Sequence, residues 1–260
     1  MRVLALDTST EYCSVSLWHD GAVIERSELA GQKHSELLIG MLDALLNEAG
    51  VKLAQLDGIA FGKGPGSFTG VRIACGATQG LAFGANLPVA GVCTLEALAE
   101  ASGRSRVIAA LDARMGEIYH AVYEKHGAVW TVVSEPRLCK PEDAPKVGNL
   151  LSADTKGRQS TPQQAGCGVD TANAELSPPP VPGESWFGAG SGFATHGNAL
   201  AERYAGQLSG IDAGMVPQAA AIAALGAVQF AAGRGVDAAQ ALPLYLRDKV
   251  ALKTFERVQR

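Results

Sequence analysis

Short runs of hydrophobic residues alternate with polar positions near the start of the chain, and helical periodicity follows. Turn residues separate the runs, and Gly50 stands where a helix would end. The predicted strands are 3–7, 13–18, 22–29, 57–61 and 88–92. The predicted helices are 33–50, 68–84 and 94–102. Three strands followed by alternating helices and strands predict a mixed α/β lobe.

A second group of strands begins after residue 105, which suggests a duplicated lobe although no direct repeat is visible. Its predicted strands are 106–112, 117–125 and 128–133. After an ordered stretch at 185–192, we predict helices near 196–205 and at 218–232. The chain is therefore predicted to be an α/β protein with two lobes, of the actin-like (ASKHA, ribonuclease H-like) fold class.

The lobes are expected to divide the chain unequally. Residues 1–105 form the N-terminal lobe, which the C-terminal helix 217–233 completes, and residues 106–216 form the second lobe. Within the second lobe, residues 152–184 are rich in Pro, Gly, Ser, Thr and Gln. Such a segment cannot bury enough apolar surface to offset its ordering entropy, so we interpret it as a surface insertion without fixed structure. Residues 243–260 form a basic tail.

Composition limits the class of protein. Hydrophobic residues make up 47% of the chain and charged residues 18%, which is typical of a globular protein. Five cysteines without a C-x-x-C pair favour reduced thiols, and no apolar stretch approaches the roughly 20 residues of a membrane helix. We expect a cytoplasmic protein. The net charge of −4 argues against strong RNA binding by this chain alone.

Two turns are candidates for phosphate binding. In actin-like ATPases, the hairpin that corresponds to Asp7-Thr8-Ser9 faces the nucleotide, although an Asp here could simply cap a turn. The segment 62–72 joins a strand to a helix, where backbone N–H groups can bind an anion, but it fits neither a Walker A loop nor G-x-G-x-x-G. A tight structural turn is therefore the first interpretation and anion binding the second. The candidate residues for weak binding of ATP or ADP are Asp7, Thr8, Ser9, Gly64, Gly66 and Ser67.

Two helices carry unusual surfaces. In the helix at 33–49, apolar side chains sweep roughly 200° of the circumference, more than the ~100° that one core requires. The excess indicates either deep burial within the lobe or a second, external interface, and we favour a partner. In the helix at 68–84, Gly76, Gly80 and Gly84 are spaced four apart. Each glycine destabilises a helix by roughly 1 kcal/mol relative to alanine. Close packing, on the lobe's own sheet or on a partner helix, would explain that cost.

No catalytic constellation emerges from the sequence. The five histidines form no H-x-x-x-H or H-E-x-x-H motif, and no Cys/His pair has the spacing of metal ligands. His120 lies within a predicted strand and is interpreted as a packed side chain rather than a base. The sequence therefore predicts neither a catalytic residue nor a metal site.

Five motifs in order resemble the bacterial TsaB (YeaZ) family across nearly all of the chain outside the insertion. They are DTST (7–10), KHSELL (33–38), GPGSFTGVRI (64–73), LDARMGEIY (111–119) and PLYLR (243–247). TsaB is similar to TsaD, the metalloenzyme that transfers a threonylcarbamoyl group to an adenosine of tRNA. The resemblance implies a non-catalytic partner of a TsaD-like enzyme in forming N6-threonylcarbamoyladenosine, with no cofactor of its own required.

The resemblance also implies what has been lost and what has been kept. Where TsaD has two metal-binding histidines four residues apart, this chain has Thr94, a poor ligand for such a metal, and Leu98, which is no ligand. In the family the first two helices pair with those of TsaD, so a homodimer is expected alone and a heterodimer with the enzyme. A TsaE-like ATPase is the further partner, and tRNA is contacted indirectly. The implied interface residues are His34, Leu37, Leu38, Met41, Leu42, Leu45, Phe68, Arg72, Gly76 and Gly80.

Other functions remain open at this point. An actin-like kinase acting alone would need phosphate-binding residues from both lobes. A peptidase acting alone would need a metal site or a nucleophile–base pair. The second lobe offers only the glycine-rich segment 188–192 for phosphate binding. A self-sufficient tRNA-binding protein is disfavoured by the negative net charge.

Overall fold

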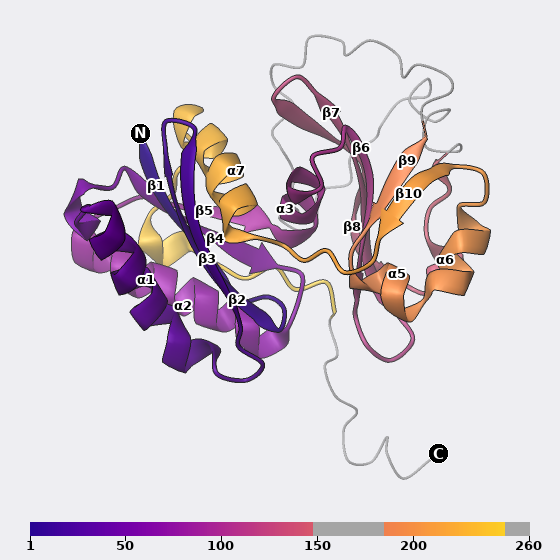
Figure 1. The fold of residues 1–260 in the computed structure, drawn as a ribbon, viewed down its shortest axis with the longest axis horizontal. Helices are drawn as coiled ribbons and strands as arrows, with labels where there is room; N and C mark the ends of the chain where they lie inside the picture. The colour runs from indigo at the N-terminus through magenta and orange to yellow at the C-terminus, as the bar shows by residue number, and fades with distance from the viewer. Residues whose placement is uncertain (148–184, 248–260) are drawn as a thin grey trace.

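Two five-stranded sheets, each with its own helices, lie beside one another in the chain (Figure 1). The computed structural model describes residues 1–147 and 185–247. The predicted insertion 152–184 and residues 248–260 of the predicted tail lie outside the described residues. The two-lobed α/β fold expected from the sequence is confirmed.

The first sheet has the strand order β3-β2-β1-β4-β5. Its strands are β1 (Arg2–Asp7), β2 (Tyr12–His19), β3 (Ala22–Leu29), β4 (Gly58–Gly64) and β5 (Val89–Cys93). β1 pairs antiparallel with β2 and parallel with β4. Every residue of β1 after Arg2 is buried, because helices cover both faces of the sheet. The three-strand start and the alternation after it match the sequence prediction.

Four helices pack on this sheet, two on each face. On one face lie α1 (His34–Ala49) and α2 (Phe68–Ala85), which share a core with β1, β2 and β4. On the other face, α7 (Ala219–Ala231) packs against β1, β2 and β4, and α3 (Thr94–Ala101) packs against α7. Short 3-10 turns occur at Leu53–Gln55 and Ala238–Gln240.

The second sheet has the order β10-β9-β6-β7-β8. Its strands are β6 (Arg106–Asp112), β7 (Ile118–His126), β8 (Val129–Cys139), β9 (Trp186–Ala189) and β10 (Leu208–Asp212). A 3-10 turn occupies Pro141–Asp143. The sequence analysis did not predict β10. Its only β-branched residue is Ile211, and Ser209 and Gly210 weaken the strand signal.

One predicted helix is divided. Instead of a single helix near 196–205, the structure has α5 (Ser191–Thr195) and α6 (Gly197–Arg203). His196 lies between them with φ −124°, outside the helical range, so the backbone turns there.

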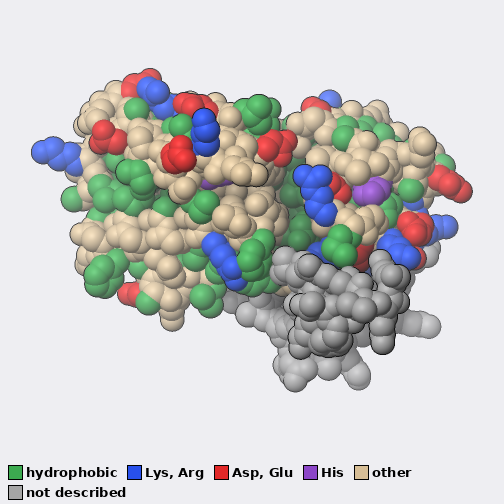
Figure 2. Space-filling model, turned by 90° about the horizontal axis from the view of Figure 1, so that it is seen from below, with side chains coloured by type: hydrophobic (Ala, Val, Ile, Leu, Met, Phe, Trp, Pro, Cys, Tyr) green, Lys and Arg blue, Asp and Glu red, His purple; other side chains and the backbone are tan. Residues whose placement is uncertain are grey.

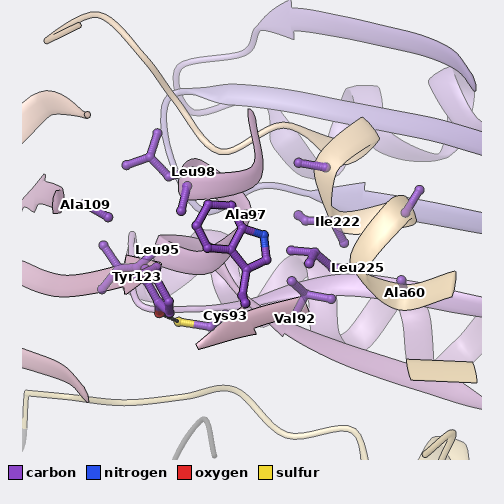
Figure 3. Close-up of a cluster of buried hydrophobic side chains, with 14 of the residues drawn as sticks. Ala60, Val92, Cys93, Leu95, Ala97, Leu98, Ala109, Tyr123, Ile222 and Leu225 are labelled. Carbon is purple, nitrogen blue, oxygen red and sulfur yellow. Dashed lines mark hydrogen bonds between the residues drawn. The ribbon is translucent and has the colours of Figure 1, made fainter. Parts of the chain in front are cut away.

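A single hydrophobic cluster connects the two sheets through α3 (Figure 3). Ala60 and Ile222 reach it from the first lobe, while Ala109 and Tyr123 reach it from the second. Leu98 of α3 is fully buried among them. The Tyr123 hydroxyl lies 3.6 Å from the Cys93 sulfur and adds a polar contact across this junction. The lobes therefore share part of their core on the side where α3 lies.

Candidate cleft and helix surface

A cavity of about 670 Å³ lies between the lobes on a side not filled by α3. Figure 2 shows the molecule from below, with the two lobes on either side of a furrow. Both lobes contribute polar and apolar side chains to the wall. The cavity is lined by Ser9, Thr10, Glu11, Gly31, Gly66, Ser67, Phe68, Leu111, Asp112, Ala113, Arg114, Met115, Tyr119, Ser191, Thr195 and Arg247.

Asp7 lies at the end of β1 and is buried beneath this wall rather than lining it. The Ser9 hydroxyl donates to Asp7 Oδ2 over 2.8 Å, and the Ser9 amide donates to the same oxygen over 3.2 Å. Among residues 1–147 and 185–247, Asp7 Oδ1 has no hydrogen-bond partner. Burial raises the pKa of Asp7 to about 6, although the bonds from Ser9 oppose that rise. The carboxyl group is thus held within a closed turn.

The glycine-rich turn before α2 packs directly on the turn after β1. The Ser67 amide donates to the Ser9 carbonyl over 2.7 Å, and the Thr8 hydroxyl donates to the Gly70 carbonyl over 2.6 Å. The Ser67 hydroxyl accepts from the Gly70 amide and caps α2. A Cβ at Gly70 would overlap the Thr8 carbonyl oxygen, so glycine is needed for this close approach. Tight structural packing, the first interpretation from sequence, describes the turn.

The predicted nucleotide residues therefore divide into two groups. Ser9, Gly66 and Ser67 line the cavity. Asp7, Thr8 and Gly64 lie behind it, fully or almost fully buried, and support the turn. Whether a nucleotide binds there stays a prediction.

The second lobe supplies Asp112, to which the sequence analysis gave no site role, and Ser191 of the segment 188–192, which it considered only for phosphate binding. Asp112 ends β6, accepts from the Arg114 amide over 3.1 Å and lies 3.6 Å from His196 Nε2. The Ser191 hydroxyl accepts from the Asp112 amide over 3.1 Å. The available signal was the position of the two segments in the chain. The segment 111–119 begins at the end of β6, and the segment 188–192 begins at the end of β9. Because these two strands pair in parallel, their ends bring the segments together.

The wide apolar arc of α1 is used mostly within its own lobe. Leu38, Met41, Leu42 and Leu45 are all buried in the core shared with the sheet, which contradicts the expectation that some of them face outward. The physical reason is that α1 packs against β2, β3 and α2, so its own chain covers more than one side of the helix. These four side chains are not available for contact with a partner.

The remaining predicted residues of α1 differ in exposure. His34 is buried, and its Nε2 bonds to the Thr10 carbonyl over 2.9 Å. Leu37 is half-buried against the core. Ile39, which belonged to the apolar arc but not to the predicted interface, is 54% exposed.

The outer row of α2 is exposed to solvent, although Tyr245 contacts its first two residues. Phe68, Arg72, Gly76, Gly80 and Gly84 follow one another at intervals of four and are all exposed. A Cβ at Gly76, Gly80 or Gly84 would meet no atom of the described part of the chain within 4 Å. Packing on the lobe's own sheet therefore does not explain the glycines. We call this row, together with the exposed side chains Ile39 and Phe83, the α2 face; the sequence analysis overlooked Phe83, although it adjoins the glycine row and is 84% exposed.

A model of the family described as TsaD, tRNA N6-adenosine threonylcarbamoyltransferase, matches residues 26–255. The tRNA threonylcarbamoyladenosine biosynthesis protein TsaB of Buchnera aphidicola subsp. Schizaphis graminum is 33% identical over 53% of this chain and 68% of that protein. The chain belongs to the TsaB family, which is related to TsaD. The TsaB of Escherichia coli is 46% identical over 55% of this chain and 64% of that protein. The TsaB of Haemophilus influenzae is 44% identical over 55% of this chain and 66% of that protein. These two alignments span slightly less than two thirds of the relatives' length.

A solved structure extends the likeness to almost the whole chain. YeaZ from Pseudomonas aeruginosa superimposes with a TM-score of 0.73 and 37% identity, covering 94% of this chain and 99% of that one. The TsaB-family membership expected from the five motifs is thus confirmed.

The resemblance sets Thr94 and Leu98 against the TsaD histidines, and in this structure both side chains are engaged in the chain's own fold. The Thr94 hydroxyl donates to the Pro65 carbonyl over 2.5 Å, and Leu98 is packed in the interlobe core. Within residues 1–147 and 185–247, no three His, Cys, Asp or Glu side chains gather so that they could hold a metal ion. In the same ranges, no helix is both long and apolar enough to cross a membrane.

Proposed function

We propose that this chain is the non-catalytic partner of a TsaD-like enzyme in the formation of N6-threonylcarbamoyladenosine in tRNA. Membership of the TsaB family supports the pathway. The observation that carries the partner role is the α2 face, where three helical glycines stand in open space. Each glycine costs a helix about 1 kcal/mol relative to alanine, and no contact with the described residues offsets that cost.

The α2 face suits a second helix. Residues four apart form a ridge, and glycines in that ridge leave a shallow groove into which the side chains of another helix can pack. Phe68 and Phe83 add exposed apolar surface on α2 itself, and Ile39 adds exposed apolar surface on α1, which packs against α2; a partner would remove this surface from water. In the proposed contact, Phe68, Arg72, Gly76 and Gly80 keep the interface role assigned from the sequence. Ile39 and Phe83 take the place of the four buried side chains of α1.

The same surface accounts for the proposed assemblies. Alone, the chain pairs with a second copy through the α2 face, since a two-fold contact uses one patch twice. The enzyme displaces that copy and forms the heterodimer. A TsaE-like ATPase joins this pair, and tRNA is held through the complex, because a net charge of −4 gives this chain little attraction for it. The chain remains in the cytoplasm, where tRNA is modified.

Nucleotide binding is a secondary part of the proposal. The hydroxyls of Ser9 and Ser67 and the backbone at Gly66 line the interlobe cavity and could contact the phosphates of ATP or ADP. Binding is expected to be weak, because Asp7 is buried behind this wall and cannot reach a phosphate-bound metal without rearrangement. Hydrolysis by this chain is not expected.

The test is a charge placed in the glycine row. Gly80→Glu puts a carboxylate in open space on α2, so the monomer should fold, while a partner helix would have to bury an unpaired charge. The matched control is Gly197→Glu, at a helical glycine of α6 that is also open but lies in the other lobe.

Each variant is mixed with the TsaD-like enzyme of the same organism and followed by size exclusion with light scattering. Modification of unmodified tRNA by the complete enzyme set is then measured. Wild type and Gly197→Glu should form the heterodimer and support modification, and Gly80→Glu should do neither. Full modification with folded Gly80→Glu would overturn the proposal.

A further inference from the structure

The segment 243–247, here called the strap, runs from the first lobe into the space between the lobes (Figure 1), and its last residue contacts the second lobe. Its first anchor is the end of β4, where the Leu244 amide donates to the Lys63 carbonyl over 2.6 Å. A Cβ at Gly64 would lie 2.9 Å from the Leu244 carbonyl oxygen, and the φ of +102° at Gly64 also favours glycine. The strap is therefore seated closely against the first lobe.

The second anchor is the start of α2. The Tyr245 hydroxyl accepts from Arg72 Nε over 2.6 Å, and the Tyr245 ring lies 5.7 Å from the Phe68 ring. The Arg72 guanidinium lies 3.6 Å from the centre of the Phe68 ring, a cation–π contact. Tyr245 thus holds the two side chains with which the α2 face begins.

The third anchor is in the second lobe. Arg247 Nη2 lies 2.7 Å from Glu117 Oε2 and donates to the Ala113 carbonyl over 3.0 Å. Only 14% of the Arg247 side chain is exposed, so solvent screens this ion pair less than a surface pair. The guanidinium serves both a carboxylate and a backbone carbonyl, which its planar array of donors allows and a lysine would not reproduce.

The loop that Arg247 holds has an unusual backbone. Arg114, Met115 and Gly116 have φ values of +63°, +58° and +77° in succession. The left-handed conformation is unfavourable for the two residues with a side chain, so contacts from outside the loop must help to maintain it. Arg247 supplies such contacts, because it bonds to the carbonyl of Ala113 and to Glu117, at the two ends of the loop.

The strap joins opposite walls of the interlobe cavity. Phe68, held by Tyr245, lines the wall of the first lobe, and Arg114 and Met115 line the wall of the second. Arg247 itself lines the cavity. Elsewhere the lobes are joined through α3, where Glu100 accepts from Lys125 and Trp130, each over 2.6 Å. The molecule thus has a packed junction at α3 and a separate, thin connection at the strap.

We propose that the strap is an interlobe clamp in which Arg247 positions the 113–117 loop and Tyr245 connects that loop to the α2 face. Loss of the Arg247 contacts frees the loop and widens the cavity. Occupation of the α2 face by a partner fixes Phe68 and Arg72, and through the strap it stabilises the loop. This last step rests on the proposed function, whereas the clamp itself belongs to the chain alone.

The clamp is tested by hydrogen–deuterium exchange on the full chain without a partner. Arg247→Ala should speed exchange of the amides of Ala113 and Glu117, which bond within the loop, by about tenfold or more, because exchange reports local opening. The matched control is Arg26→Ala, which also removes an Arg–Glu pair but one confined to the first lobe. A second variant, Glu117→Gln, keeps Arg247 and should produce a smaller increase in the same peptides. Unchanged exchange of residues 113–117 in folded Arg247→Ala overturns the clamp.

A second measurement separates the clamp from the proposed function. With the TsaD-like enzyme added, exchange of residues 113–117 should slow in wild type but much less in Tyr245→Ala, which lacks the link to Arg72. If the enzyme slows hydrogen exchange in α2 of wild type but not in residues 113–117, the proposed coupling between the α2 face and this loop is wrong. The proposed function then stands. If the enzyme slows hydrogen exchange nowhere in the chain, the proposed function fails. The clamp is then judged by the exchange of residues 113–117 in Arg247→Ala alone.

Discussion

Replacing two glycines of the α2 face by alanine should stabilise the chain and weaken its assembly at the same time. The perturbation is the double variant Gly76→Ala and Gly80→Ala. Each new methyl group meets no atom within 4 Å, so nothing in the described structure has to move. Alanine is favoured over glycine in a helix by about 1 kcal/mol, so the pair should add about 2 kcal/mol to the free energy of unfolding. In a chain of this size that raises the melting temperature by about 4–8 °C.

The effect on binding should have the opposite sign. If a partner helix approaches α2 closely, two methyl groups prevent that approach, and overpacking of this kind costs about 1–3 kcal/mol. Affinity for the TsaD-like enzyme should then fall by about 5- to 150-fold. Calorimetric unfolding gives the stability and titration calorimetry gives the affinity. Gly197→Ala, in α6, serves as the control that leaves binding unchanged.

Two results would refute this reasoning. At a dilution where light scattering shows a monomer, a lower melting temperature would mean that some part of the chain packs on the glycine row. Wild-type affinity in a stabilised variant would mean that the partner does not approach α2 closely. The opposite signs make the test sharp, because general damage to the fold lowers both stability and affinity.

Further predictions concern buried groups and the positions that replace metal ligands. The pKa of Asp7 is raised from 3.8 to about 6, so the folded state binds a proton at this carboxyl more tightly than the unfolded state does. The stability that this proton contributes is lost as pH rises through 6. Denaturant titrations should therefore show Asp7→Asn to be more stable than wild type at pH 7, by up to about 3 kcal/mol. The difference in the free energy of unfolding should disappear below about pH 4. An equal difference at both pH values would mean that the ionisation of Asp7 is not its cause. Burial lowers the pKa of His120 from 6.5 to about 3, so wild-type stability should decline as pH falls below 6.5, and His120→Gln should show a shallower decline in acid unfolding. Untagged protein should contain well under one zinc or iron atom per chain by elemental analysis, because Thr94 and Leu98 offer no ligands, and one metal per chain would contradict this. Replacing residues 155–182 by a short Gly/Ser linker should shift the melting temperature by only a few degrees, and insoluble protein would be the contrary result.

Most strands and helices of the first lobe could be predicted because their local signals agree. β1 and β2 carry compact apolar runs separated by turn residues, and α1 and α2 end at Gly50 and Asn86 in the left-handed conformation. β10 was missed because it has little β-branched character and is paired only through β9. Its conformation depends on a neighbouring strand that local sequence does not reveal.

The candidate surfaces were only partly predictable for a different reason. The apolar arc of α1 gives the width of the hydrophobic surface but not the number of neighbours, and Leu38 and Leu42 are buried because α2 and the sheet both lie against this helix. The glycine row of α2 was more informative, since glycine in a helix has a cost that must be offset somewhere. Its functional interpretation needed the structure, which leaves Gly76 and Gly80 without a neighbour in the described chain.

The positions of these surfaces suggest how a chain whose sequence reveals no catalytic constellation could act on an enzyme. The α2 face begins at Phe68 and Arg72, and the same two side chains hold Tyr245 of the strap. Residues that would contact a partner are thus one contact away from the segment that reaches the interlobe cavity. Rigid connections of this kind can couple binding at one surface to the geometry of another, provided that the element between them has two arrangements. Arg247 is the residue at which such a second arrangement would have to appear, because it alone among the described strap residues forms an ion pair with the second lobe.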